Sequence, residues 1–495
     1  EVGLDSVAWD VSYVARTDRV YVSHLGSDLV SVVDGTSGEL VMELNLPTAP
    51  AGLKVSPDES TVWVAVAGGD AIASIDVNTN EVTAFSPAGT PGPDGEYLAN
   101  SNVNALAYDP QRGRLYASLG SENAVAVFSE DDLSYLGSIP TSEYPTDVAL
   151  SPDGAWLLVS EGLGYTAPNE GRGAKEIVAG SVSRLDLENL DLAASTARVR
   201  ANMLRPQLVF PFECDGFFPV PTRPDRRSPI EHVVLLVKEN KTFDCVFGDL
   251  EGMDVDVDPS LVRYGEEVTP NQHALAREFA ISDNFYAEVE DSDVGHVLLT
   301  SAHLTEFVRR VWIEKDRSDN LGEGYQISES AVPQDGNFFT HLMDHDIDLA
   351  IYGEVVGLFI NSRRGLGMPI LHSDPGFPGG GYVNYSVTDE EKARYFAGQV
   401  ADGRLAEFSY VLFPNDHTVG TRRGYPTPES MVADNDLAVG IVVEAIANSP
   451  FWEKSAIIIV QDDPQGCSDH VDAHRSFVMV VSPWARRRYV SHVQA

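Results

Sequence analysis

Polar side chains of the kind that bind metal ions follow three apolar segments in the second half of the chain. The segments 233–237, 411–413 and 457–460 run directly into acidic, amide or imidazole groups. These groups belong to Glu239, Asn240, Asp416, His417, Asp462 and Asp463, with His470 a little further on. Adjacent carboxylates that leave a buried strand without a cation cost several kcal/mol. A divalent ion removes that cost, and mixed oxygen and nitrogen donors suit Zn, Mn, Fe, Mg or Ca to different degrees.

Each of these motifs has a simpler explanation when it is taken alone. An Asp-Asp pair after a strand is usually a cap or a turn, and an Asp-His pair is no more specific. Their joint occurrence at three strand ends, followed by the His/Asp-rich segment 469–474, favours a metal site. We therefore predict that all of these residues contribute to metal binding.

The elements that must position these groups alternate between short apolar runs and amphipathic stretches. Buried strands are predicted over 232–237, 349–352, 409–413, 456–460 and 478–481, and helices over 294–312 and 434–448. Strands that alternate with helices indicate a mostly parallel sheet covered on both faces. Ligands of such sheets bind outside the carboxyl ends of the strands, which is where the polar groups lie.

The first two hundred residues have a different pattern, with period-2 segments bounded by Gly, Asp and Pro. Four copies of one repeat begin near Val7, Gly52, Ala105 and Asp147. Their spacing is close to the ~40–50 residues of a four-stranded propeller blade, and such blades pack radially because one alone cannot bury both faces. Propellers supply binding surface more often than chemistry, so a recognition or scaffold role is expected here.

Both halves also resemble known families. The repeats resemble the YVTN-type β-propeller family, and 230–244 with Phe247-Gly248 resembles the opening signature of the phosphoesterase family within the alkaline phosphatase superfamily. The second resemblance continues through 269–271, 283–286, 412–418 and 433–436 and closes with 462–475. It implies a multidomain chain: an all-β propeller over 1–200, a linker over 201–229, and an α/β/α alkaline-phosphatase-like domain with a mostly parallel sheet over 230–495. Because YVTN propellers usually have about seven blades, we expect at least four here and an incomplete ring.

The resemblance also implies roles for individual residues. Glu239-Asn240 and Asp462-Asp463 match family metal ligands, and His417 and His470 match histidines that bind metal or contact the phosphoryl group. Ser292, in Ser292-Asp293-Val294-Gly295-His296, occupies the place of the family nucleophile. A helix that starts there would direct its N–H groups at a phosphate, and His296 could neutralise oxygens or protonate the leaving group. Alone, Ser292 would be an ordinary N-cap residue, and Thr242 is the reserve nucleophile.

Net charge and cysteine content restrict the partners and the compartment. The formal net charge is −41, and only 7 residues are lysine, a balance typical of proteins kept soluble at high salt. Such a surface repels phosphate backbones and anionic headgroups, which excludes nucleic acid and membrane surfaces as expected partners. No apolar window is long enough for a transmembrane segment. The three cysteines form either one bridge, with Cys214–Cys245 the favoured pair, or three buried thiols.

Two functions from different classes follow. The first is a metal-dependent phosphoric-ester hydrolase, outside the cytoplasm or on the cell surface, that acts on a mono- or diester small molecule or lipid headgroup. It would work through Ser292 and a phosphoenzyme, with a protein or glycan partner on the propeller. The second is an extracellular binding or surface scaffold protein that keeps an inactive phosphatase fold. The acidic run 288–293 beside Ser292 supports the second function, because it would repel an anionic substrate unless it is neutralised.

Overall fold

The chain divides into two compact units in a computed structural model. The residues described are 8–47, 49–97, 99–163, 179–203, 218–221, 226–315, 329–333, 336–353, 372–380, 384–464 and 466–494. Unit 1 comprises Glu1–Thr166, Val178–Pro206 and His303–Asp335, and unit 2 comprises Ala167–Ile177, Gln207–Ala302 and Gly336–Ala495.

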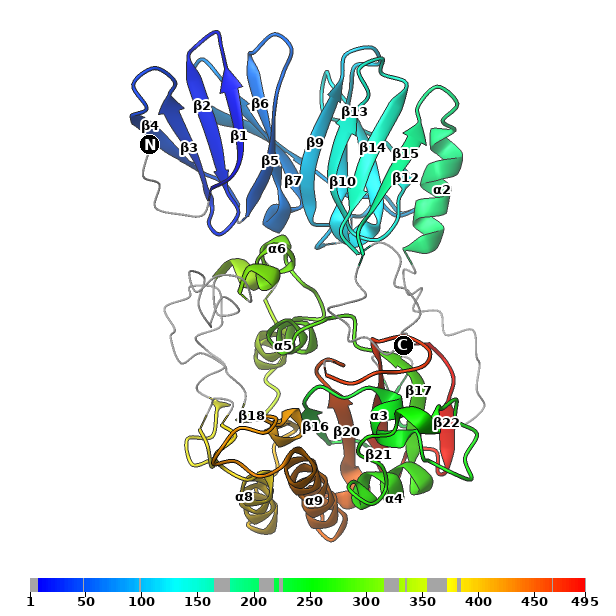
Figure 1. Cartoon of the computed structure of the whole chain (residues 1–495). Coiled ribbons are helices and arrows are strands. Elements are labelled where there is room, and N and C mark those ends of the chain that lie inside the picture. Colours follow the sequence, from blue (N-terminus) through cyan, green and yellow to red (C-terminus); the bar gives the residue numbers. More distant parts are fainter. Residues whose placement is uncertain are drawn as a thin grey trace. The chain divides into compact units, whose positions relative to one another are not determined.

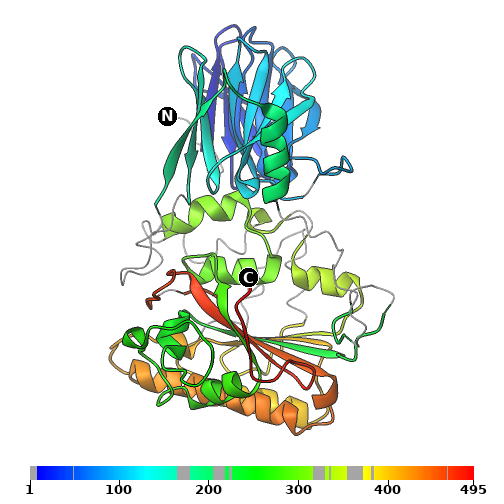
Figure 2. The same cartoon turned by 90° about the vertical axis from the view of Figure 1, so that its right-hand side faces the viewer.

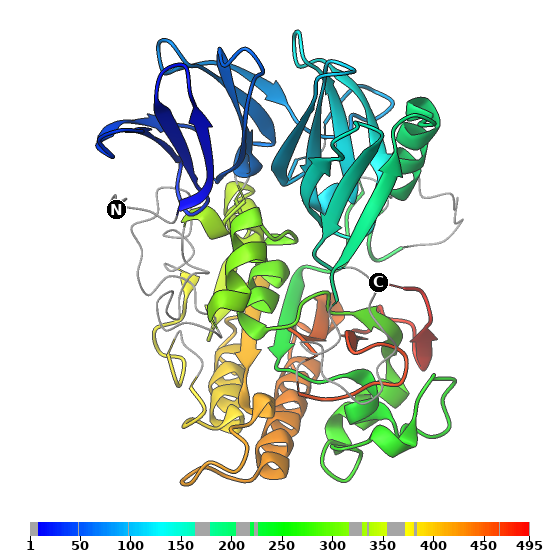
Figure 3. The same ribbon diagram turned by 45° about the horizontal axis from the view of Figure 1, so that its top comes forward.

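Unit 1 contains four antiparallel sheets that follow one another along the chain as propeller blades (Figures 1 and 3). The first blade comprises β1 (Ala8–Val14), β2 (Arg19–His24), β3 (Leu29–Asp34) and β4 (Leu40–Asn45), and the second comprises β5 (Pro50–Val55), β6 (Thr61–Val66), β7 (Ala71–Asp76) and β8 (Glu81–Pro87). The third comprises β9 (Val103–Asp109), β10 (Arg114–Leu119), β11 (Ala124–Ser129) and β12 (Tyr135–Pro140), and the fourth β13 (Pro145–Leu150), β14 (Trp156–Glu161) and β15 (Ser181–Asp186). Helix α2 (Leu192–Asn202) follows. The propeller-like arrangement predicted from the repeats is confirmed.

Successive blades pack face to face because alternate residues of each strand are apolar. Val30 and Val32 of the first blade share a core with Val62 and Val64 of the second, and similar cores join the second to the third and the third to the fourth. The innermost strands approach closely: a Cβ atom on Gly52 would lie 2.8 Å from the Cα atom of Ala105. Small residues at these positions therefore set the spacing of the blades.

Unit 1 also includes a helix from the sequence of the second domain. The sequence predicted one helix over 294–312, but the structure has α5 (Ser292–Ser301) and α6 (Glu306–Lys315), with Ala302 in the left-handed region at φ 52° between them. Glu306 of α6 is buried, accepts hydrogen bonds from Tyr144 Oη (2.6 Å) and Asn104 Nδ2 (3.2 Å), and pairs with Arg310. The described residues of His303–Asp335 therefore group with the blades by their contacts, while the predicted boundaries of the domain over 230–495 stay a prediction.

Unit 2 is built on a seven-stranded sheet of order β18-β19-β16-β20-β21-β17-β22. The strands are β16 (His232–Lys238), β17 (Ala280–Tyr286), β18 (Leu349–Tyr352), β19 (Phe408–Phe413), β20 (Ser455–Gln461), β21 (Arg475–Val481) and β22 (Tyr489–Ser491). The first four strands in the sheet are parallel, and β21 runs antiparallel to both of its neighbours. The sheet is mixed and mostly parallel, as predicted, and all five predicted strands are present, whereas β17 and β22 were not predicted.

Helices cover both faces of this sheet, as its central strand requires (Figure 2). They are α3 (Phe243–Phe247), α4 (Pro270–Glu278), α5, α7 (Phe338–Asp344), α8 (Asp389–Ala401) and α9 (Pro428–Ala447). Val234 and Leu236 of β16 pack in the core that contains residues of α8 and α9. Val237, next along β16, packs in the core on the opposite face with Phe339 of α7. This alternation buries both faces of the strand and leaves its carboxyl end for polar side chains.

One disulfide crosses unit 2, and it is not the pair that the sequence favoured. Cys245 of α3 is bonded to Cys467 in the loop after β20. The predicted Cys214–Cys245 bridge was therefore wrong, because the fold brings together two cysteines that lie 222 residues apart in sequence. Cys214 and much of the predicted linker lie outside the described residues.

Among the described residues, no helix is both long enough and apolar enough to cross a membrane.

Candidate metal and catalytic site

The predicted site residues leave the sheet at one level because three parallel strands end together. Lys238 at the end of β16 is paired in register with Phe413 of β19 and with Gln461 of β20. The residues that follow these strands are Glu239 and Asn240, Pro414 to His417, and Asp462 and Asp463. Their convergence at the carboxyl edge follows from the parallel register.

Glu239, His296 and Asp462 form one compact group at this edge. The Nε2 atom of His296 lies 3.3 Å from Oε1 of Glu239 and 3.8 Å from Oδ2 of Asp462. Both carboxylates are buried, and one donor atom from each of the three residues lies within 4.8 Å of the other two. The hydroxyl of Tyr410 lies 3.4 Å from the other ring nitrogen of His296 and helps to fix the ring.

This donor set fits a divalent metal ion. Ligand atoms about 2.1 Å from a common tetrahedral ion lie about 3.4 Å apart, which is close to the separations from His296 to the two carboxylates. Two carboxylates and an imidazole also supply the mixed oxygen and nitrogen donors that Zn and Mn accept.

Ser292 lies beside the same group. Its Oγ atom donates a hydrogen bond to Oδ1 of Asn240 at 2.9 Å. The backbone N–H of Asn240 in turn donates to Oδ1 of Asp462 at 3.1 Å, and Asn240 has φ 59°, in the left-handed region that Asn tolerates better than most residues. The turn after β16 thus links the hydroxyl of Ser292 to the acidic end of β20.

Gly295 allows helix α5 to approach this edge. The carbonyl of Asp291 accepts hydrogen bonds from the N–H groups of Val294 (3.1 Å) and Gly295 (2.9 Å), which closes the first turn. A Cβ atom on Gly295 would lie 2.5 Å from the carbonyl oxygen of Asp462. Only glycine fits that separation, so this residue brings Ser292 and His296 against the end of β20.

The local electrostatics reflect a concentration of negative charge. Burial raises the pKa of Asp462 well above its ordinary value, and the charges of Glu239 and Asp463 raise it further, whereas His296 acts in the opposite direction. Burial lowers the pKa of Lys241 to about 8 although nearby carboxylates oppose this effect, and its Nζ atom donates to the carbonyl of Asn240 at 3.0 Å. The site therefore favours an added positive charge, either protons or a metal ion.

Asp416 has a different part in the structure from the one predicted. Its Oδ2 atom accepts from Nζ of Lys238 (2.6 Å) and Nε2 of Gln461 (3.2 Å). Its Oδ1 atom accepts from the N–H of Glu239 (3.0 Å) and Nδ2 of Asn435 (3.1 Å). These four bonds occupy the acceptor capacity of both oxygens. Asp416 is therefore the buried counterion of Lys238, and we do not retain it as a proposed metal ligand.

His417 and Asp463 are not members of the group formed by Glu239, His296 and Asp462. The Nδ1 atom of His417 contacts the carbonyl of Thr418 at 2.7 Å, and its ring lies 5.3 Å from that of Tyr385. Burial raises the pKa of Tyr385, and the charges of Glu239 and Asp462 add to the effect. Asp463 is fully buried, and its charge acts on Asp462.

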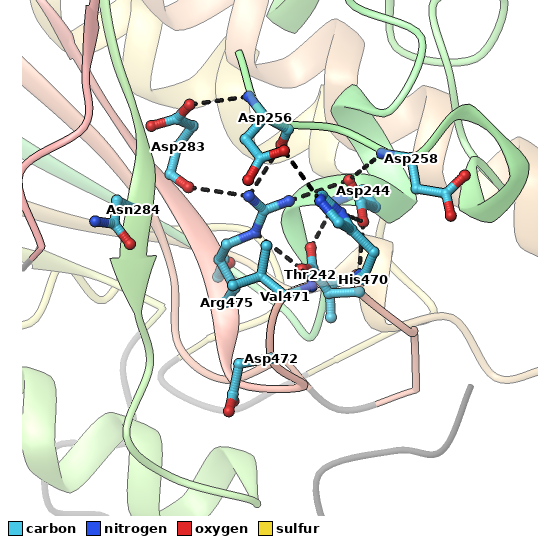
Figure 4. A network of polar contacts seen from close by, with 12 residues as sticks. Thr242, Asp244, Asp256, Asp258, Asp283, Asn284, His470, Val471, Asp472 and Arg475 are labelled. Atoms are coloured by element: carbon cyan, nitrogen blue, oxygen red, sulfur yellow. Dashed lines mark hydrogen bonds and ion pairs between the residues drawn. The ribbon is translucent and has the colours of Figure 1, made fainter. Parts of the chain in front are cut away.

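His470 belongs to a separate network (Figure 4). Its Nδ1 atom lies 2.7 Å from Oδ2 of Asp244, and its Nε2 atom lies 3.1 Å from Oδ1 of Asp256. Burial alone would lower the pKa of His470, but the bonds to Asp244 and Asp256 outweigh it and raise the pKa. Its contacts thus differ from the ligand role that the sequence predicted.

Asp244, Asp469 and His470 also bring donor atoms within 4.8 Å of one another. The buried guanidinium of Arg475 already forms ion pairs with two members of this group, Asp244 at 3.1 Å and Asp469 at 2.9 Å. A fixed cation is therefore present, which makes this group a poor metal site. Thr242, the reserve nucleophile, donates its hydroxyl to the carbonyl of Ser468 at 2.7 Å and so anchors the same loop.

Sequence reasoning assigned Lys238, Gly295 and Tyr410 no role in the site. Two of them carried a signal. Lys238 ends a strand of buried residues, where a lysine needs a counterion, and Gly295 stands inside the first turn of a helix, where glycine is costly unless the backbone is approached closely. Tyr410, inside an apolar strand, carried no such signal.

A known protein family matches most of the sequence that forms the second unit. Residues 254–494 match the model of the Phosphoesterase family, a range that begins after Asn240 and includes Ser292, His296 and Asp462. Antigen Lp49 of Leptospira interrogans is 26% identical over 176 residues, which cover 34% of this chain and 36% of that protein. The chain thus matches about a third of the length of this curated relative.

Two solved structures show a weak similarity to part of the chain. Hydrazine synthase of Kuenenia stuttgartiensis is 19% identical, with a TM-score of 0.30 over 38% of this chain and 48% of that chain. Dihydro-heme d1 dehydrogenase NirN in complex with DHE is 18% identical, with a TM-score of 0.28 over 36% of this chain and 35% of that chain. These TM-scores support no conclusion about activity. The match over 254–494, on a mostly parallel sheet with its polar groups at the carboxyl edge, identifies this part of the chain as a Phosphoesterase family domain that follows a propeller-like region.

Proposed function

We propose that the chain is a metal-dependent phosphoric-ester hydrolase with Ser292 as its nucleophile. The observation that carries the proposal is the convergence of Glu239, His296 and Asp462 beside the hydroxyl of Ser292. The family of the second unit supports the class of reaction.

The residues of the site divide into metal ligands and a nucleophile. Glu239, Asp462 and His296 would hold the ion, with Asn240 and Asp463 as neighbouring candidates. His296 therefore takes a ligand role in place of the acid–base role expected from the sequence, because its Nε2 atom faces the two carboxylates. A bound divalent ion would act as a Lewis acid that neutralises phosphoryl oxygens and lowers the pKa of a nearby hydroxyl.

Ser292 would attack phosphorus directly. Asn240 orients its hydroxyl, and the positive end of the α5 dipole favours an anionic group at this position. A bond forms between the Ser292 oxygen and phosphorus while the bond from phosphorus to the ester oxygen breaks, and the alcohol leaves with the proton that the Ser292 hydroxyl gives up. Water then hydrolyses the serine ester, which restores the hydroxyl and releases phosphate from a monoester or a phosphate monoester from a diester. Monoesters and diesters, including lipid headgroups, are the proposed substrates, and the propeller would bind a protein or glycan partner.

Hydrolysis of p-nitrophenyl phosphate and bis(p-nitrophenyl) phosphate with Mn²⁺ or Zn²⁺ tests this proposal. We expect turnover that EDTA removes and that Ser292→Ala abolishes. Ser430→Ala is the matched control, because Ser430 is an exposed serine in the first turn of α9. Full activity in Ser292→Ala would contradict the nucleophile assignment.

A surface or extracellular scaffold protein is the second candidate. It is favoured by the similarity to a protein named as an antigen. In that case no divalent ion would support turnover, while metal binding would still raise the melting temperature.

We also infer that the protein works outside the cytoplasm, at the cell surface, in the periplasm or beyond. The Cys245–Cys467 disulfide supports this location, because disulfides persist mainly in oxidising compartments. The net charge of −41 supports function at high salt.

A further inference from the structure

The acidic segment between β17 and α5 forms an ion pair with His474, which follows the motif Asp469-His470. Glu290 is 3% exposed, and its Oε1 atom lies 3.4 Å from Nε2 of His474. The Nδ1 atom of His474 lies 2.9 Å from Oδ1 of Asp472. The imidazole therefore sits between two carboxylates, one on each side of its ring.

Main-chain contacts hold the same two segments together. The N–H of Ala287 donates to the carbonyl of His474 at 3.0 Å. Beyond Glu290, the carbonyl of Asp291 closes the first turn of α5. We call the contacts of His474 with Ala287 and Glu290 the clamp. Ser292 thus lies between the clamp and the close contact of Gly295 with the end of β20.

The charge of His474 matters as much as its position. Burial alone would lower the pKa of His474, but the hydrogen bonds to Asp472 and Glu290 outweigh it and raise the pKa to about 9. At neutral pH the ring is an imidazolium that neutralises Glu290. The acidic run therefore directs less negative charge at an anionic substrate than its sequence indicates.

We propose that His474 is a positioning residue for Ser292: by pairing with Glu290 and Asp472, it fixes the segment 287–291 and offsets the charge of that segment. This inference rests on the proposed function, since it assigns a role toward the nucleophile. It also explains how an acidic segment can precede a residue that must approach a phosphate ester.

Kinetics of His474→Gln test the proposal with p-nitrophenyl phosphate and Mn²⁺. We expect kcat to fall by about 10- to 100-fold, because a displacement of about 1 Å of a reacting group has an effect of that order. Adding Glu290→Gln should recover part of the loss, since the second change removes the unneutralised carboxylate. Mn²⁺ affinity should remain within about threefold of the wild-type value, because the change displaces the nucleophile and not the ligand set.

His492→Gln is the matched control, since His492 also pairs with a carboxylate, Asp283 at 3.0 Å, but in another part of the sheet. It should leave kcat unchanged. A kcat of His474→Gln within twofold of wild type would overturn the proposal, as would parallel losses of Mn²⁺ affinity and activity. If His474→Gln does not fold, the isosteric Glu290→Gln alone provides the test, with a smaller fall in kcat expected.

Hydrogen–deuterium exchange separates this inference from the proposed function. His474→Gln should speed exchange in 287–295 and leave the blades unchanged. If the wild-type protein has no turnover with any divalent ion, the hydrolase proposal fails, and faster exchange confined to 287–295 would still support the clamp. Unchanged exchange in that segment would overturn the clamp whatever the activity.

Discussion

Replacing Gly295 with alanine should displace the nucleophile without removing any functional group. The added methyl carbon would lie 2.5 Å from the carbonyl oxygen of Asp462 and 2.9 Å from its carbonyl carbon. Both atoms belong to the backbone at the end of β20, so no flexible side chain can move away. Helix α5 must move instead, and it carries Ser292 and His296 with it.

The size of the effect follows from this contact. An ordinary contact of a Cβ atom begins near 3.4 Å, so the helix must shift by about 0.9 Å. A shift of that size costs about 100-fold in rate when it moves a reacting group. It also separates His296 from Glu239 and Asp462, so Mn²⁺ affinity should fall as well. Crowding costs about 1–3 kcal/mol of stability, partly offset by the better helix propensity of alanine, about 1 kcal/mol.

Steady-state kinetics with p-nitrophenyl phosphate and Mn²⁺ titration by calorimetry measure both effects. Gly398→Ala in α8 is the matched control, since no atom lies within 4 Å of a Cβ at that helical glycine. It should keep wild-type kcat and gain about 0.5–1 kcal/mol of stability. Wild-type kcat and Mn²⁺ affinity in Gly295→Ala would refute the close approach of α5 to the end of β20.

Two further predictions concern buried charge in unit 2. Lys238→Met should lower the free energy of unfolding, measured by urea denaturation, by about 3–5 kcal/mol, because it leaves the Asp416 carboxylate buried without its cation. Adding Asp416→Asn should recover part of this loss. As a control, Lys454→Met removes one partner of an exposed pair and should cost under about 1 kcal/mol. The pKa of His474 is about 9 in the folded protein against an ordinary 6.5. This difference adds about 3 kcal/mol to the free energy of unfolding, which is fully present below pH 6.5 and lost as pH rises through 9. The difference in unfolding free energy between wild type and His474→Gln should therefore shrink from about pH 6 to about pH 10, and a constant difference would contradict the pairing.

Local patterns in the sequence predicted the propeller-like sheets and five of the seven strands of unit 2. Period-2 segments such as 61–66 and apolar runs such as 456–460 are strands, as predicted. The pattern of apolar residues within each short segment is enough to show which faces of the strand are buried. The parallel register then followed from the alternation of strands and helices, and it brought Glu239 and Asp462 together as predicted.

Features that depend on distant partners were not predictable in the same way. The division of 294–312 into α5 and α6 reflects Ala302 in the left-handed region and the burial of Glu306 among blade residues. The pairing of Asp416 with Lys238 depends on β16 and β19 being neighbours in the sheet, although they lie far apart in the sequence. The Cys245–Cys467 bridge and the separate network of His470 likewise depend on the packing of the loop after β20.

Anomalous diffraction from crystals soaked with Mn²⁺ tests the central claim most directly. We predict one strong peak surrounded by the carboxylates of Glu239 and Asp462 and by Nε2 of His296, with the hydroxyl of Ser292 adjacent, and its loss in Asp462→Asn. A peak between Asp244 and Asp469 instead, or no peak at the end of β20 with saturating Mn²⁺, would contradict the account.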